Sequence, residues 1–324
     1  MRINPILEKE LKVKMRGWKS PILITTYLFV LCMIIFFAFR EIEKTSDFGP
    51  QAALDIYYVI VSLQFVLLSM ITPALTATAI SGEKERQTLD LLLCTEASAF
   101  SIVWGKLTAS IAHVILLIIV SLPVLGTIFM FGGINLFDII FVFIYYIVVC
   151  FFLASMGLFF STIFKKNLTS IIFTYATSLI IYFGHYILLF ITSIFYYSYF
   201  YGPSSFDDNI MGIIFMLSNP IIGFGLVLNP DAADYYFAGN VGVFIEIIPP
   251  WIYSCILYVI LTYLLIRFSI YKINPLKGRR VGVKVIEETE ENLGMNVDNI
   301  EIEEIEEVGK EGEILDKENP FSTK

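Results

Sequence analysis

Long apolar stretches alternate with short charged connections along most of this chain. A helix that crosses a bilayer needs roughly 20 mostly apolar residues, because lipid offers the backbone no hydrogen-bond partners. Six stretches meet this requirement, over residues 21–39, 56–80, 107–131, 139–164, 168–198 and 247–270. The pattern predicts an all-α polytopic membrane protein, with six transmembrane helices in a transmembrane domain over residues 21–272.

A further apolar stretch, residues 210–228, is interrupted near its middle by an Asn-Pro pair and by glycines. If it crossed the membrane, the basic cluster at 272–280 would lie on the side opposite the basic N-terminus. Lysine and arginine collect on the cytoplasmic side, and with six spans only Arg40 and Lys44 of the 22 basic residues lie outside. We therefore predict cytoplasmic termini in a multi-pass protein of the cell membrane. Residues 199–246 then form an outer loop that contains a re-entrant or interfacial segment.

Composition agrees with this topology and excludes other classes of protein. The chain is 57% hydrophobic and only 16% charged, whereas soluble domains are roughly 25% charged. The net charge of −8 comes from the C-terminus, because residues 281–324 carry −10 and the rest of the chain +2. A body of this charge does not suit nucleic acid. Residues 273–324 are charge-dense and poor in aromatic residues, which predicts a disordered acidic tail in the cytoplasm.

The segment before the first span, residues 1–20, is predicted to form an amphipathic helix. Asn4 can cap it, and Pro5 suits its first position. One apolar stripe consists of Leu7, Leu11, Met15 and Trp18, while Arg16 and several lysines make the other faces basic. Such a helix lies in the membrane interface, with its basic face toward lipid headgroups. The alternative is a helix docked on another protein.

A short charged helix is predicted between the second and third spans, over residues 81–97. Glu83 and Glu85 fall in its first turn, where the helix dipole favours negative charge. Arg86 and Asp90 stand four residues apart and can pair. A helix of this kind is either a solvated turn or a knob that docks into a soluble partner and passes motion to the two spans.

Caps and an apolar face complete this connection. Ser81 is predicted to cap the charged helix, and Ser98 to cap the helix that enters the third span. Leu89 and Leu92 belong to a short apolar face beside the charged start.

One motif, at the N-terminus, is NPILEKELKVKMRG. A second motif is ISGEKERQTLDLLL, followed by a later Gly-Lys. Together they resemble the permease subunits of the ABC-2 family of ATP-binding-cassette (ABC) transporters, in particular its bacterial members. The family pattern after the second span is matched by Gly82-Glu83, Glu85-Arg86, Thr88-Leu89, Leu91-Leu92-Leu93 and Gly105-Lys106. The chain departs from the pattern at Gln87, where a glycine is common. The resemblance covers residues 4–272 approximately and leaves out the acidic tail.

The resemblance implies a fold similar to that of type V exporters, in which two such permeases, identical or different, form one translocation path. Each would rest on a separate cytoplasmic ABC ATPase, which would hold the ATP and Mg; this chain would hold no cofactor or metal and would not be an enzyme. Residues 81–97 would be the coupling helix and residues 1–20 the elbow helix. The residues implied in coupling are Glu83, Glu85, Arg86, Thr88, Leu89, Asp90 and Leu92. The elbow residues are Leu7, Leu11, Met15, Arg16 and Trp18.

Polar residues inside the spans are candidates for function by default. Gln64, His113 and His185 are the candidates to line a path through the membrane. The alternative is hydrogen bonding between helices, which we favour for both histidines because neither has a carboxylate three or four residues away.

Other functions are weighed against an exporter. No G-x-x-x-x-G-K-[ST] loop occurs, so the chain is not expected to hold ATP through backbone amides. One alternative is a non-transporting sensor or immunity component that keeps the permease architecture. A membrane-embedded enzyme that acts through His185 or Asp55 ranks last.

Overall fold

The computed structural model describes residues 8, 10, 12, 16–45, 49–89, 98–130, 132–199, 218–232 and 249–273. All of them belong to the first of two units, Met1–Ile273. The second unit, Asn274–Lys324, which contains the predicted acidic tail, lies outside the described residues. Every regular element in the described part is a helix.

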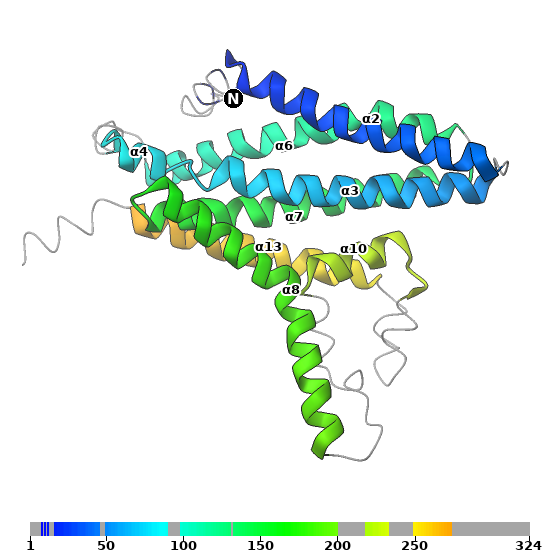
Figure 1. The fold of residues 1–324 in the computed structure, drawn as a ribbon. Helices are drawn as coiled ribbons and strands as arrows, with labels where there is room; N and C mark the ends of the chain where they lie inside the picture. The colour runs from blue at the N-terminus through cyan, green and yellow to red at the C-terminus, as the bar shows by residue number, and fades with distance from the viewer. Residues whose placement is uncertain are drawn as a thin grey trace, which may run out of the picture. The chain divides into compact units, whose positions relative to one another are not determined.

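Six helices are long and apolar enough to cross a membrane, and successive ones run in opposite directions (Figure 1). They are α2 (Lys19–Thr45), α3 (Pro50–Thr76), α6 (Ala99–Phe129), α7 (Leu136–Ile163), α8 (Asn167–Tyr199) and α13 (Pro250–Ile273). Two short helices, α4 (Ser81–Glu85) and α10 (Pro220–Leu228), accompany them. The predicted all-α polytopic membrane fold is confirmed.

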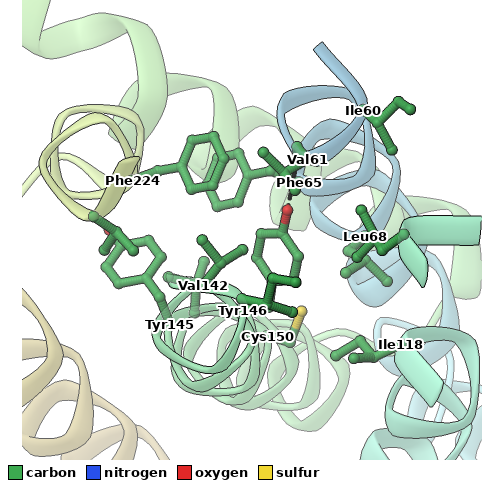
Figure 2. Close-up of a cluster of buried hydrophobic side chains, with 14 of the residues drawn as sticks. Ile60, Val61, Phe65, Leu68, Ile118, Val142, Tyr145, Tyr146, Cys150 and Phe224 are labelled. Carbon is green, nitrogen blue, oxygen red and sulfur yellow. Dashed lines mark hydrogen bonds between the residues drawn. The ribbon is translucent and has the colours of Figure 1, made fainter. Parts of the chain in front are cut away.

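Helix α7 lies at the centre of the bundle, packed against α3, α6, α8, α10 and α13. Its Tyr145 and Tyr146 are fully buried. The hydroxyl of Tyr146 donates to the Val61 carbonyl of α3 at 2.5 Å. Phe65 of α3 stacks on Phe224 of α10 with centroids 4.5 Å apart and rings nearly parallel at 2° (Figure 2). Aromatic stacking and buried hydroxyls therefore hold α10 and α3 against α7.

Helix α10 is anchored at both its first turn and its middle. The Asn219 side chain caps it by accepting from the Ile221 N–H at 2.8 Å, and donates to the Tyr182 carbonyl of α8 at 2.9 Å. Tyr145 donates to the Pro220 carbonyl at 2.9 Å. A Cβ at position 223 would collide with the Tyr145 hydroxyl. Because Gly223 has no Cβ, α10 can lie this close to Tyr145 of α7.

Nine residues of α10 span roughly 13 Å at ~1.5 Å per residue, less than half of a ~30 Å hydrocarbon core. The described half of the ambiguous apolar segment is therefore too short to cross as α10 alone. Residues 210–217 lie outside the described part, so the re-entrant or interfacial path of 210–228 stays a prediction.

The outward faces of the crossing helices are apolar. Large side chains such as Ile119, Ile180, Val259 and Tyr263 are about half exposed or more. A soluble protein rarely leaves so much contiguous apolar surface in water, and an integral membrane protein places such surface against lipid.

Candidate coupling site

Lys106 joins three separate parts of the chain at one end of the bundle. It lies in the second turn of α6, with only 4% of its side chain exposed. Its Nζ donates to Glu83 Oε1 of α4 at 2.7 Å and to Glu10 Oε1 of the N-terminal segment at 2.9 Å. One buried ammonium thus connects the predicted elbow helix, the predicted coupling element and a crossing helix.

The charge balance at this junction depends on Lys106. Two carboxylates share its single positive charge, and the second carboxylate oxygen of Glu83 is buried without a hydrogen-bond partner. A buried charge that loses its partner is strongly unfavourable. We call these three residues the Glu10–Lys106–Glu83 triad. Lys106 was predicted only as part of the Gly-Lys motif, and Glu10 was not predicted.

Helix α4 is also tied to the start of α8 and the end of α7 by hydroxyl groups. The Ser161 Oγ of α7 accepts from the backbone N–H groups of Ile80 and Ser81 at 2.8 and 2.7 Å. The Ser81 hydroxyl donates to Asn167 Oδ1 at 2.8 Å and to the Ala77 carbonyl at 3.1 Å.

The predicted Ser81 cap is therefore wrong. Ile80 is the cap residue, and Ser81 is the first helical residue. The Glu83 and Lys84 N–H groups, which a cap at Ser81 would satisfy, donate instead to the Ile80 carbonyl, each at 3.0 Å. The predicted Ser98 cap is confirmed, since its Oγ accepts from the Ser101 N–H at 3.2 Å.

Two charged side chains of α4 match the ends of the neighbouring helices. Glu85 Oε2 accepts from the Asn167 N–H at 3.2 Å, at the positive end of α8. The Lys84 ammonium donates to the Thr162 carbonyl, at the negative end of α7. Each pairing satisfies a backbone group that the helix itself leaves free and complements its dipole. Helix α4 is thereby fastened across the α7–α8 turn.

The predicted helix 81–97 is not continuous. Helix α4 ends at Glu85, and Gln87 has a φ of +57°, a left-handed conformation that a right-handed helix does not contain. The Thr88 N–H returns to the Glu83 carbonyl at 2.9 Å. Leu89 is then buried in a cluster with residues of α6, including Val103 and Leu107.

The positive φ at Gln87 gives the glycine of the family pattern a physical reason. A left-handed conformation costs a non-glycine residue about 1–2 kcal/mol, and the greater chain entropy of glycine offsets about 0.5–1 kcal/mol of that. We expect Gln87→Gly to raise the free energy of unfolding by about 0.5–1 kcal/mol.

Denaturant titration of the purified chain in detergent measures this effect. Thr88→Gly, at a neighbouring exposed position without a positive φ, is the matched control and is expected to lower stability. Equal effects of the two substitutions would contradict the left-handed turn.

The exposed end of this element adjoins a hollow. The stretch from Glu85 to Thr88 is exposed, and a cavity of about 470 Å³ opens beside it, lined by Glu10, Thr78, Ala79, Gly82, Glu83, Arg86, Thr88 and Asn167. The structure therefore brings Glu83, Glu85, Arg86, Thr88 and Leu89 into one region. Asp90 and Leu92 of the predicted coupling set, and the Arg86–Asp90 pair, lie outside the described residues.

Only part of the predicted elbow helix is described. Leu7, Leu11 and Met15, with the predicted Asn4 cap, lie outside it, whereas Arg16 and Trp18 are exposed, Trp18 to 83%. Glu8 and Lys12 form an exposed ion pair of 2.6 Å one turn apart. The hydrogen bond and the charge of Lys12 lower the pKa of the Glu8 carboxyl.

Two of the three candidate path residues, Gln64 and His113, have described side chains, and each bonds to a different partner. Gln64 is fully buried, and its Nε2 donates to the Ser121 hydroxyl of α6 at 2.7 Å. His113 is 8% exposed, with Nε2 3.3 Å from the Ser20 hydroxyl of α2. His185 lies in α8, and its side chain is outside the described set. Gln64 and His113 each join two helices, as residues that hold a bundle together do.

In the described part of the chain, no group of three or more histidine, cysteine, aspartate or glutamate side chains is arranged to hold a metal ion.

Comparison with known families identifies the class to which this fold and site belong. The family model described as ABC-2 family transporter protein matches residues 4–250, about three quarters of the chain. The chain therefore belongs to the ABC-2 family and is a membrane permease component of an ABC transporter, as the two motifs predict. Such components generally work with a cytoplasmic ABC ATPase and are generally not catalytic themselves. No curated protein matches the chain.

Proposed function

We propose that this protein is the permease subunit of an ATP-driven exporter in the cell membrane, with both termini in the cytoplasm. The observation that carries the proposal is the Glu10–Lys106–Glu83 triad, which joins the elbow segment, α4 and α6. A force applied to α4 reaches all three through short charge-assisted hydrogen bonds, the stronger kind of hydrogen bond.

The exposed tip of the element is the proposed contact with the ATPase. Glu85, Arg86 and Thr88 are exposed there, while Ser81 and Leu89 on either side are buried in the bundle. A polar, exposed tip on an anchored base suits a surface that docks into a soluble partner. The cavity beside the tip offers a recess for side chains of that partner.

Attachment of α4 at several points makes it a lever in this proposal. Lys84 and Glu85 fasten it to the ends of α7 and α8, and Glu83 fastens it to α6. When the ATPases bind ATP and Mg and close, the tip moves and carries these three crossing helices with it. The translocation path opens by that shared displacement, and the energy comes from the partner.

The apolar faces that remain uncovered in one chain support the remaining partners. In the apolar stretch of α2 that could cross the membrane, only 11% of the residues are buried within this chain. In the corresponding stretch of α8 the share is 22%. Lipid and a second permease, identical or homologous, are proposed to cover these faces. Gln64, which joins α3 to α6, and His113, which joins α6 to α2, are proposed to hold these helices together beside the path that two permeases form.

Arg86→Glu tests the proposed contact. Because Arg86 is exposed at the tip, we expect this substitution to leave folding intact and to reduce ATPase turnover stimulated by the permease at least about tenfold, the effect of losing one charged contact of about 1.4 kcal/mol or more. The measurement is co-purification and turnover of the cassette ATPases from the same genome, co-expressed with the full chain.

Arg40→Glu makes the same change in charge near the C-terminal end of α2. It is the matched control and is expected to behave like the wild type. If no ATPase co-purifies, or if both variants retain full stimulation, the proposal fails. Binding and stimulation of an ATPase without movement of any substrate in vesicles would instead indicate the non-transporting component.

A further inference from the structure

Three lysines from three separate elements meet where α7 ends and α8 begins. Lys84 belongs to α4, Lys165 to the α7–α8 turn, and Lys272 to the last turn of α13. The ammonium of Lys84 donates to the Thr162 carbonyl, three residues before Lys165. Helix α13 packs along α7, and near the ends of these two helices the rings of Phe268 and Phe159 lie 6.0 Å apart.

The lysines repel one another. Partial burial, and then the charges of Lys272 and Lys165, lower the pKa of the Lys84 ammonium. The two carboxylates next to Lys84 in the chain have other partners: Glu83 accepts from Lys106, and Glu85 accepts from the Asn167 N–H. The ion pairs found among the described residues involve none of the three lysines. Like charges gathered in this way are unfavourable until an anion joins them.

The surroundings of the lysines indicate the source of that anion. Large apolar side chains beside them are exposed: Leu168 of α8 to 69%, and Phe268 and Tyr271 of α13 to 61% and 56%. Side chains of this kind face lipid in a membrane protein, and tyrosine concentrates at the depth of the headgroups. The lysines therefore lie at the lipid-facing rim of the bundle, at headgroup depth, and not on a surface surrounded by water.

We infer that Lys84, Lys165 and Lys272 together bind the headgroup phosphate of an anionic phospholipid. The inference rests on the proposed orientation, which places these residues in the inner leaflet. A phosphate offers several acceptor oxygens, and Lys84, which gives one N–H to Thr162, has two N–H groups left for it. Because Lys84 belongs to α4, the lipid stabilises the position of the coupling element.

Lipid binding to the purified full chain tests the inference. The chain in detergent is titrated with phosphatidylglycerol and, separately, with phosphatidylcholine, and bound lipid is counted by native mass spectrometry. Wild type is expected to prefer phosphatidylglycerol. The double variant Lys165→Gln, Lys272→Gln removes two exposed charges and leaves the Lys84–Thr162 hydrogen bond in place. We expect it to bind phosphatidylglycerol about 30-fold more weakly, since each lysine contributes about 1 kcal/mol.

The matched control is Arg40→Gln, Lys44→Gln, which removes two charges from the other end of α2 and is expected to bind phosphatidylglycerol like the wild type. Equal binding of the two lipids, or full phosphatidylglycerol binding by the Lys165/Lys272 variant, would overturn the inference. Displacement of the lipid by an equal concentration of glycerol phosphate would show a site for free phosphate instead. Loss of ATPase co-purification with lipid binding unchanged would assign the lysines to an acidic protein surface. Since lipid binding is measured without the ATPase, failure of the exporter proposal leaves this result readable.

Discussion

Replacing Lys106 by methionine is expected to lower the free energy of unfolding by about 3–5 kcal/mol, as removal of one partner from a buried ion pair does. Methionine keeps the length and apolar stem of the lysine but leaves Glu10 and Glu83 facing each other without a cation. Denaturant titration of the purified chain in detergent measures the loss.

The same substitution is expected to abolish stimulation of the ATPase, because it separates the elbow segment and α4 from α6. Arg267→Met, at an exposed basic position of α13, is the control and is expected to change stability by no more than about 0.5 kcal/mol.

A second set of variants separates the charge from the shape of the triad. Adding Glu10→Gln and Glu83→Gln to Lys106→Met removes the uncompensated carboxylates and is expected to restore most of the stability. ATPase stimulation is expected to stay low, since the bridging hydrogen bonds are still lost. If the triple variant is as unstable as Lys106→Met alone, packing of the lysine stem and not charge explains the loss.

The second large effect is expected at Gly157, where α7 closely approaches α3. A Cβ on Gly157 would collide with the Thr76 hydroxyl and would come within 3.2 Å of the Ala77 backbone nitrogen. Backbone yields little, so we expect Gly157→Ala to cost about 1–3 kcal/mol, the usual effect of overpacking. The contact lies just before α4, and the substitution is also expected to weaken ATPase stimulation.

The chain contains a matched control for this substitution. A Cβ on Gly126 of α6 would have nothing within 4 Å, and glycine inside a helix is less favourable than alanine by about 0.5–1 kcal/mol. Gly126→Ala is therefore expected to be neutral or stabilising. Adding Thr76→Ala to Gly157→Ala removes the worst contact and is expected to recover part of the loss. A tolerated Gly157→Ala in the same denaturant titration would contradict the close approach.

The proposed lever also explains why α4 needs few residues of its own. A helix of five residues is too short to be stable alone. Its stability comes from Ser161, Asn167 and Lys106 on neighbouring elements. Movement of α4 without movement of its neighbours would break these hydrogen bonds, so the element transmits displacement and does not absorb it.

Several features were accessible from the sequence because they are local. The six crossing helices follow from apolar runs long enough to span a bilayer, and the Ser98 cap follows from a serine placed directly before such a run. The two sequence motifs indicated the ABC-2 family, which the family model confirms over residues 4–250. In each case neighbouring positions along the chain carry the whole signal.

Features that depend on distant residues could not be predicted in this way. Lys106 meets partners 96 and 23 positions away, and Lys84 and Glu85 meet theirs about 80 positions away. No local pattern tells which acceptor a lysine will reach. The Ser81 cap was wrong because the cap residue is Ile80, and its carbonyl accepts from the Glu83 and Lys84 N–H groups that Ser81 was expected to cap.

The amino-acid sequence alone thus determined the class of fold, the six candidate crossing helices and the family, because transfer of apolar segments into lipid depends on composition over about 20 consecutive residues. The tertiary structure decided the left-handed turn at Gln87 just after α4, the packing of α10 in the core and the two carboxylates that share Lys106. Those outcomes depend on the geometry in which separate helices meet, and buried polar groups accept only the partners that this geometry brings within hydrogen-bonding distance.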